Sequence, residues 1–235
     1  MIQIIPLASS SAGNAYYITD GTTALLLEAG IRWRDIQRAL DFKTQDIAGC
    51  LITHEHGDHI KGATEVLKAC IPVYASQGTL DAAKVSGHRA KPVQAMKKFV
   101  IGTWTIMAFD VRHDVSEPLG FLLVNEAGDK LLFATDTYYI PYRFEGLTHI
   151  MVECNYSKRL LDENVASGKV PALQKKRLLR SHFCLENVKE FLKANDLHQV
   201  QEIWLLHLSD SNSDEAMFKR EVQELTGKLV YIAER

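Results

Sequence analysis

Residues 51–62 (LITHEHGDHIKG) concentrate side chains that can bind a metal or carry a proton: three histidines, one glutamate and one aspartate within six consecutive positions. The apolar run that precedes them predicts a strand, so His54 and His56 project to the same side of extended chain. Asp58 and His59 follow a glycine bend, at the start of a predicted helix, and must point elsewhere. This spacing predicts two donors for one metal ion and two for a second ion nearby.

Three polar residues elsewhere in the chain each end an apolar run, and they are the expected partners of this cluster. His113 follows TIMAFDVR, Asp136 ends LLFATD and His207 ends EIWLLH. If these runs are core strands, their ends would bring the three side chains together at one edge of the fold. A lone histidine at a strand end is more often a capping or surface residue, so this interpretation depends on the cluster. Nitrogen and oxygen donors without thiolate suit Zn²⁺, with Mn²⁺ or another divalent ion as the alternative.

The composition is that of an ordinary globular protein. The chain has 235 residues, of which 46% are hydrophobic and 24% charged, and we expect one domain spanning residues 1–235. A net charge of −2 gives no overall attraction to nucleic acid or to a membrane, although a local patch could still provide one. The chain lacks a leader-like start and any apolar run near 18 residues, so we expect a cytoplasmic protein with no membrane partner. We expect the cysteines to be core thiols: Cys50, Cys70, Cys154 and Cys184.

Short apolar runs predict two strand-rich regions, each accompanied by helices. The first region covers about residues 2–75 and includes helices at 32–42 and 60–70. The second begins near residue 98, and after residue 153 its pattern changes to helices and two further strands, at 202–208 and 228–233. This pattern indicates an α/β fold, a four-layer αβ/βα sandwich.

The predicted ligands, in their order along the chain, resemble the dinuclear site of the metallo-β-lactamase superfamily. That family has HxHxDH, a later histidine, a bridging aspartate and a final histidine. The resemblance covers essentially the whole chain and implies two divalent ions, Zn²⁺ or Mn²⁺. The ligands of one ion would be His54, His56 and His113, those of the other Asp58, His59 and His207, with Asp136 bridging.

More narrowly, several segments resemble the YycJ/WalJ group of hydrolases, among them LASSSAGNAYYI, FATDT, VECNYS and LLHLSDSN. That resemblance implies 5′-to-3′ exonuclease activity on DNA. The chain departs from the group in its first loop and in SHFCLEN, and Glu28 stands where the group has aspartate.

The reaction predicted from this ligand set is hydrolysis of a phosphodiester by a metal-activated hydroxide. Two ions that share a solvent species lower its pKa from about 15.7 toward neutrality. Asp58 would orient the nucleophile, and His182 is the candidate proton donor to the leaving oxygen. A helix-capping surface histidine is the alternative for His182, and the resemblance favours catalysis.

Two segments are candidates for binding the substrate. Residues 169–182 are basic without any acid, and Lys176, Arg177 and Arg180 could contact phosphates, although a solvated helix face is the ordinary alternative. Ser11 and Asn14 lie in a small polar loop whose backbone amides could approach a phosphate, unless the loop is only a turn.

We therefore predict a dinuclear-metal phosphodiesterase acting on nucleic acid, specifically a DNA exonuclease. An RNA-processing endonuclease or a small cyclic-phosphodiester hydrolase would use the same chemistry, and a metal-free nucleic-acid-binding protein is the non-enzymatic alternative. A true β-lactamase is disfavoured because Asp136 occupies the position where many such enzymes have cysteine.

Overall fold

The computed structural model describes residues 1–233, and the chain within it forms two compact units. Unit 1 comprises Met1–Asp110 and Val115–Lys130, and unit 2 comprises Val111–Asp114 and Leu131–Ala233. That residues 1–235 act as one domain stays a prediction. None of the described helices has the length and apolar character needed to cross a bilayer.

Unit 1 contains a six-stranded sheet in which the strands follow one another in chain order. The first three strands pair antiparallel and the rest parallel. A turn at Asp20-Gly21 joins the second and third strands, with the Asp20 carboxylate accepting hydrogen bonds from the amides of Thr22 and Thr23. The strands are β1 (Gln3–Ser10), β2 (Gly13–Thr19), β3 (Ala24–Leu27), β4 (Ile47–Leu51), β5 (Val73–Ala75) and β6 (Ala90–Pro92).

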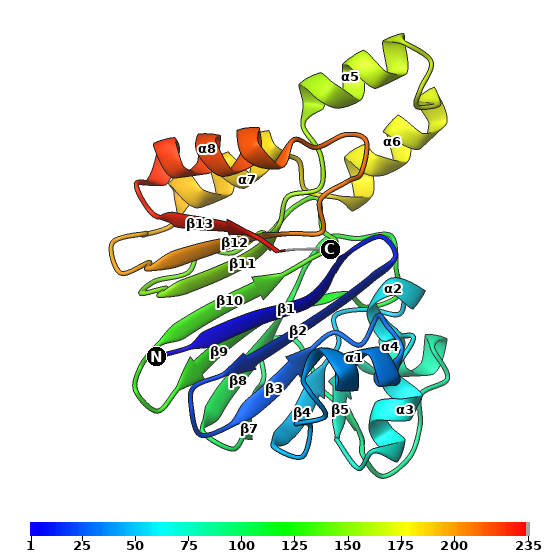
Figure 1. Ribbon diagram of the computed structural model, residues 1–235, viewed down its shortest axis with the longest axis vertical. Helices are drawn as coiled ribbons and strands as arrows, with labels where there is room; N and C mark the ends of the chain where they lie inside the picture. Colours follow the sequence, from blue (N-terminus) through cyan, green and yellow to red (C-terminus); the bar gives the residue numbers. More distant parts are fainter. Residues whose placement is uncertain (234–235) are drawn as a thin grey trace. The chain divides into compact units, whose positions relative to one another are not determined.

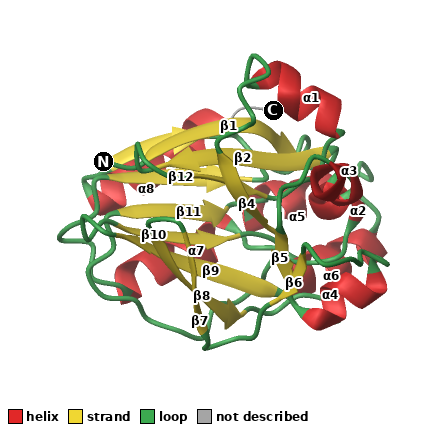
Figure 2. Ribbon diagram, turned by 90° about the horizontal axis from the view of Figure 1, so that it is seen from below, coloured by secondary structure: helices red, strands yellow, loops and turns green. Residues whose placement is uncertain are grey.

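Four short helices cover one face of this sheet (Figures 1 and 2). They are α1 (Trp33–Ala39), α2 (Gly57–Ile60), α3 (Ala63–Lys68) and α4 (Gln77–Ala82). Apolar side chains from each helix, such as Ile36 and Val66, pack with the buried residues of β4 and β5. The single helix expected over residues 60–70 is thus two helices. They separate at Gly62, where a Cβ atom would lie 2.5 Å from the carbonyl oxygen of Ile31.

The remaining strands of unit 1 form an antiparallel ribbon of β7 (Lys98–Ile101), β8 (Trp104–Asp110) and β9 (Leu119–Asn125). Trp104 is fully buried, and its indole N–H donates to the carbonyl oxygen of Thr23 at 3.1 Å. This bond fixes the start of β8 to the residue that precedes β3.

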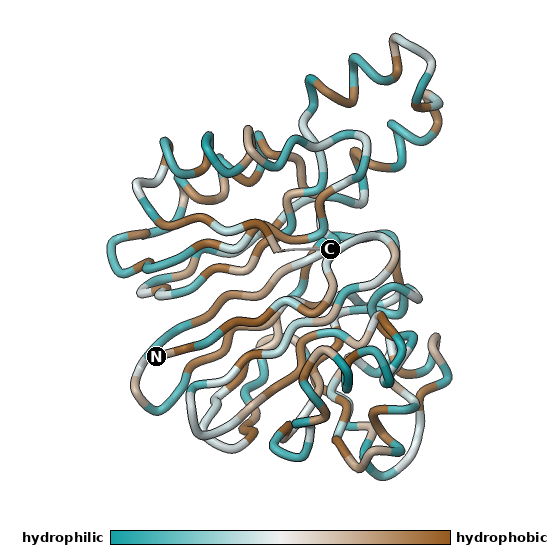
Figure 3. Tube along the Cα trace, in the orientation of Figure 1, coloured by the Kyte–Doolittle hydropathy of each residue, from teal (hydrophilic) through white to brown (hydrophobic). Residues whose placement is uncertain are grey.

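Unit 2 is built on the parallel strands β10 (Lys130–Ala134), β11 (His149–Glu153), β12 (Glu202–Leu206) and β13 (Leu229–Ile232). Its helices are α5 (Lys158–Ala166), α6 (Ala172–Ser181), α7 (Leu185–Ala194) and α8 (Glu215–Thr226). Helices α7 and α8 lie over β11–β13, whereas α5 and α6 extend away from these strands (Figure 1). Apolar and polar residues alternate along α8 (Figure 3), and Phe218 and Val222 on its apolar side are buried.

The four cysteines are free thiols, but one of them differs from the prediction. Cys50, Cys154 and Cys184 are buried as expected, whereas Cys70 is exposed. Cys70 lies beyond the end of α3 with φ 66°, so the chain has already turned away from the apolar face of the helix.

Gly30 is a position where the packing of unit 1 can be tested. A Cβ atom there would lie 1.6 Å from the carbonyl oxygen of Asp58 and 2.6 Å from the amide nitrogen of Asn14. We expect Gly30→Ala to displace α2 and to lower the melting temperature by about 2–10 °C, the usual effect of overpacking by roughly 1–3 kcal/mol. The measurement is thermal unfolding followed by circular dichroism.

Gly57→Ala is the matched control, because a Cβ at Gly57 would meet no atom within 4 Å. Its melting temperature should equal or slightly exceed that of the wild type, since alanine favours helix over glycine. Equal melting temperatures for the two variants would contradict the close approach at Gly30.

Candidate metal centre

The histidines that follow β4 face each other within unit 1. His54 is 1% exposed, and its Nε2 lies 3.2 Å from Nδ1 of His56. Its Nδ1 contacts the Thr53 hydroxyl at 2.9 Å, which fixes the orientation of the ring. Glu55, between the two histidines, instead accepts a hydrogen bond from the amide of Ser116 at 2.9 Å. The imidazole nitrogens of His54 and His56 are therefore close enough together to bind one ion.

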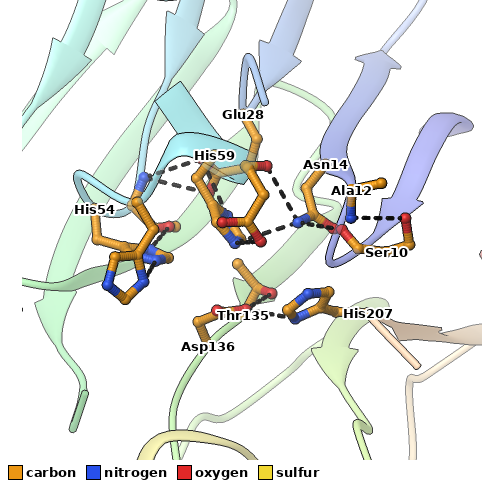
Figure 4. A network of polar contacts seen from close by, with 12 residues as sticks. Ser10, Ala12, Asn14, Glu28, His54, His59, Thr135, Asp136 and His207 are labelled. Atoms are coloured by element: carbon orange, nitrogen blue, oxygen red, sulfur yellow. Dashed lines mark hydrogen bonds and ion pairs between the residues drawn. The ribbon is translucent and has the colours of Figure 1, made fainter. Parts of the chain in front are cut away.

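His59, on α2, is the most enclosed member of the unit 1 cluster. It has no exposed surface, and its ring centroid lies 4.2 Å from that of His54. Its Nε2 is 3.4 Å from the Asp58 carboxylate. The same atom is 3.2 Å from the Asn14 amide nitrogen (Figure 4). Four potential ligands from a single short segment thus come together beside the sheet.

A buried carboxylate, Glu28, lies behind His59. It follows β3, has no exposed surface, and lies 3.7 Å from Nδ1 of His59. It also accepts a hydrogen bond from the Thr53 amide at 3.2 Å. Burial raises the pKa of Glu28, and the neighbouring His59 and Thr53 oppose that rise. The resemblance predicts an aspartate at this position, and the side chain of Glu28 is longer. Its carboxylate nevertheless lies beside His59, the histidine that an acid at this position would orient.

The polar loop between β1 and β2 is held to α2 by the side chain of Asn14. The Asn14 side chain has no exposed surface and donates to the carbonyl oxygens of Ser10 and Asp58 at 3.1 and 3.2 Å. It therefore holds the start of α2 in place. Ser11 and Ala12, which form the turn, are exposed, and the predicted phosphate contact through the backbone amides of this loop stays a prediction.

A second cluster lies at the carboxyl ends of the parallel strands of unit 2. Asp136 follows β10, Glu153 ends β11 and His207 follows β12. Together with His182, which precedes α7, each offers one donor atom, and the four atoms lie within 4.8 Å of one another. Parallel strands in register bring their carboxyl ends to one edge, which is why residues so distant in sequence meet here.

The contacts inside this cluster join nitrogen to oxygen. Nδ1 of His207 lies 2.7 Å from Asp136 Oδ1 and 3.2 Å from Glu153 Oε1 (Figure 4 shows the first contact). Nδ1 of His182 lies 2.5 Å from Glu153 Oε1. His113 orients its Nδ1 toward the carbonyl oxygen of Ser181 at 2.9 Å, and its Nε2 lies 3.9 Å from Asp136.

Glu153 is the residue of this cluster that the sequence prediction missed. It is fully buried, and its Oε2 accepts hydrogen bonds from the amides of Thr137 and Phe183, each at 3.0 Å. The signal was available, because Glu153 ends the apolar run HIMV as Asp136 ends LLFAT. Applying the same rule to every strand end would have included it.

The electrostatics of unit 2 favour a positive charge among these carboxylates. Burial lowers the pKa of His207, but Asp136 and Glu153 more than offset that effect and raise it to about 10. Burial likewise lowers and the same two carboxylates raise the pKa of His182, with a net increase. A site that stabilises an imidazolium this strongly also suits a divalent cation. Its donors, imidazole nitrogen and carboxylate oxygen, are ligands of Zn²⁺ and Mn²⁺.

Three residues at these strand ends adopt a left-handed backbone that non-glycine residues rarely occupy. They are Glu28, Asp136 and His207, with φ of 63°, 44° and 53°. Such conformations cost about 1–3 kcal/mol each and persist where the surroundings impose them, as at functional sites. Within each unit, the backbone is therefore bent sharply where it presents the clustered side chains.

The basic segment, residues 169–182, contains helix α6, and its cationic side chains differ in whether they form ion pairs. Lys175 forms an ion pair with Asp162 of α5 at 2.6 Å, and Arg177 lies 3.9 Å from Asp114. Lys176 and Arg180 are exposed one helical turn apart. These last two present charge to solvent on one side of the helix.

The fold, together with the histidine and aspartate clusters at the carboxyl ends of its strands, indicates the class of protein to which the chain belongs. Residues 23–207 match the model of the beta-lactamase superfamily domain, and the chain belongs to that family. It is a metal-dependent hydrolase of this superfamily. The predicted fold class is confirmed by the metallo-β-lactamase fold protein YhfI of Bacillus subtilis. That structure aligns with 99% of this chain and 96% of its own length, at a TM-score of 0.75 and 15% identity.

Two curated relatives narrow the resemblance to the YycJ/WalJ group, as predicted. The chain is 28% identical to the exodeoxyribonuclease YycJ of Bacillus anthracis, over 93% of this chain and 87% of the relative. It is 29% identical to the exodeoxyribonuclease WalJ of Streptococcus pneumoniae, over 88% of this chain and 81% of the relative.

The contacts of Glu153 generate a prediction about metal affinity. Glu153→Gln keeps the shape of the side chain but removes the charge that orients His182 and His207. We expect metal affinity to fall by about 10–100-fold, the usual effect of removing a group that orients metal ligands. Competition with a chromophoric chelator, at a fixed pH, measures this.

Glu202→Gln is the control, since Glu202 is a partly exposed acid of the neighbouring strand that lies 3.7 Å from His149. Its metal affinity should match the wild type. If Glu153→Gln bound metal as tightly as Glu202→Gln, the assigned role of Glu153 would be wrong.

Proposed function

We propose that this protein is a two-metal 5′-to-3′ exonuclease that hydrolyses DNA in the cytoplasm. The observation that supports the proposal is the pair of histidine–carboxylate clusters, one in each unit. Their members follow the family's ligand order in a chain similar over most of its length to two exodeoxyribonucleases. In this proposal His54, His56 and His113 would hold one ion, Asp58, His59 and His207 would hold the other, and Asp136 would serve as a ligand of both.

The bound ions would supply two things: a solvent molecule of lowered pKa and positive charge beside the oxygens of the phosphodiester. Side chains of the protein would orient the attacking water and donate a proton to the leaving oxygen. The Asp58 side chain is 23% exposed, so its carboxylate can both bind an ion and accept a hydrogen bond from the attacking water.

His182 is proposed to donate the proton that the leaving oxygen needs. The Glu153 carboxylate lies 2.5 Å from its Nδ1, which leaves Nε2 as the atom that can face a substrate. The His182 side chain is 15% exposed, so a substrate can reach it while the Glu153 carboxylate holds the ring in place. Its position just before α7 also places the amides of that helix start near any bound anion.

Helix α6 is the proposed contact with the DNA backbone. Lys176, Arg177 and Arg180 would lie along phosphates, with Arg177 further fixed by Asp114. Backbone contacts of this kind give affinity without sequence preference. The exposed loop at Ser11 is a second, weaker candidate for a phosphate contact through its amides.

A product assay tests the proposed reaction. Single- and double-stranded DNA and RNA, labelled at either end, are incubated with protein loaded with Zn²⁺ or Mn²⁺. We expect mononucleotide release from the 5′ end of DNA. We also expect His56→Ala to lower the rate at least about 100-fold, because losing even a partner of a metal ligand costs about 10–100-fold.

His88→Ala is the matched control, since His88 is an exposed histidine outside both clusters, and it should keep the wild-type rate. Internal cuts, or cleavage of RNA alone, would contradict the proposed exonuclease activity and favour an RNA-processing endonuclease. Binding of DNA with no hydrolysis under either metal would indicate a binding protein instead.

The role of α6 is tested by removing two of its exposed cations, Lys176 and Arg180, which are chosen because they lie one helical turn apart. Lys176→Gln with Arg180→Gln should weaken DNA binding, and the slope of log affinity against log salt should become shallower by about 1–2. Fluorescence anisotropy at several salt concentrations measures both quantities, using protein made inactive by His56→Ala.

The matched control replaces another exposed lysine and arginine, Lys219→Gln with Arg220→Gln on α8, and changes the net charge equally. It should leave the salt slope unchanged. If both double variants reduced binding alike, the effect would be one of overall charge and α6 would be only a solvated face.

A further inference from the structure

Unit 2 contains a cavity of about 330 Å³ that the proposed mechanism does not use. One wall is the segment that follows β10, and the other is helix α7 together with Phe183, two residues before the helix. This volume lies at the lower end of the range for small-molecule sites, about 300–1,000 Å³, so it suits one nucleoside-sized group. The lining residues that matter below are Tyr139, Tyr142, Arg143, Phe183, Asn187 and Phe191.

The cavity has aromatic walls with one exposed ring. Phe183 and Phe191 are buried, and their ring centroids lie 6.2 Å apart. Tyr139 is 54% exposed, so its ring is accessible to a ligand. Aromatic faces of this kind are stacking surfaces for nucleobases, whatever the base.

Polar groups complete the lining. Arg143 is exposed and provides a cation, while Asn187 provides an amide, whose oxygen lies 3.3 Å from the ammonium of Lys158. Glu190 adds one carboxylate, which forms an ion pair with Lys193 at 2.8 Å. A flat heterocycle with hydrogen-bonding edges, attached to a phosphate, matches this combination better than a purely apolar ligand.

Both walls of the cavity are tied to the catalytic cluster through one carboxylate. Phe183 directly follows His182, and its amide donates to Oε2 of Glu153. On the other wall, the Thr137 amide donates to the same oxygen, and the Thr137 hydroxyl donates to the carbonyl oxygen of Tyr139 at 2.9 Å. One wall of the cavity therefore begins at the residue after His182, and the other begins shortly after Asp136.

We propose that this cavity binds the base of the nucleotide next to the cleaved phosphodiester, after that base has turned out of the helical stack. The inference rests on the proposed function and extends it to substrate choice. A base held against Tyr139 cannot remain stacked in a duplex, so the protein acts on a single-stranded or frayed end. Stacking contributes to affinity for any of the four bases, so we expect no strong preference for one base at this site.

The test compares 5′-labelled single-stranded oligonucleotides that end in a normal nucleotide or in an abasic one. For the wild type, kcat/KM should be about five- to a hundredfold higher with the normal terminus, the range expected for stacking one base on an aromatic ring. Tyr139→Ala should lose most of that preference, whereas Tyr139→Phe should keep it. Tyr138→Ala is the matched control, because Tyr138 is its exposed neighbour outside the cavity lining, and it should keep the preference.

A binding measurement accompanies the kinetics. A terminal 2-aminopurine should lose fluorescence on binding to full-length protein carrying His56→Ala, and should lose much less when Tyr139→Ala is added. Equal rates on normal and abasic ends, together with unchanged fluorescence, would overturn the base-binding site while leaving the exonuclease intact. Absence of hydrolysis on every oligonucleotide would instead overturn the proposed function, and with it this inference.

Discussion

The carboxylate of Glu153, fully buried at the end of β11, connects most of the chemistry of unit 2. One of its oxygens faces His182 and His207, and the other receives the amides of Thr137 and Phe183. A buried charge is stable only when its hydrogen-bonding capacity is used, so these partners must be in place for the unit to fold. Stability and the geometry of the site thus depend on the same group.

Unit 1 uses the same device at Glu28. There a buried glutamate follows β3, accepts the Thr53 amide and faces His59. In each unit an acid at a strand end orients an imidazole from another element. The carboxylate limits how the ring can rotate, which prepares a histidine for binding a cation before any cation arrives.

Backbone strain accompanies both clusters. Glu28, Asp136 and His207 adopt positive φ, and each lies immediately beyond a strand or one residue past it. Continuing as strand would send these side chains alternately to the two faces of the sheet. The left-handed turn redirects them to the carboxyl edge instead, and the hydrogen bonds of the buried acids offset its cost.

The histidine-rich segment allowed a metal site to be predicted from the sequence, because four potential ligands rarely gather within six residues of a loop that binds no metal. The structure brings their side chains together, and their assignment as ligands stays a prediction. The rule that a polar residue ending an apolar run reaches the strand edge identified Asp136 and His207. Applied incompletely, it missed Glu153. The loop residue Asn14 was harder, since only packing reveals that its side chain holds the start of α2. Cys70 was misjudged because helical periodicity continued past the point where the chain turns.

By itself the sequence determined the family and the fold class and indicated the candidate donor side chains, because these depend on residue type and on spacing along single strands and loops. Only the tertiary structure decided which buried acids orient the histidines, which cations of α6 face solvent, and where an aromatic cavity adjoins His182. Those features depend on residues far apart in sequence, such as Glu153 and Phe183. Their meeting is fixed by parallel strand register and by the packing of α7, and local patterns record neither.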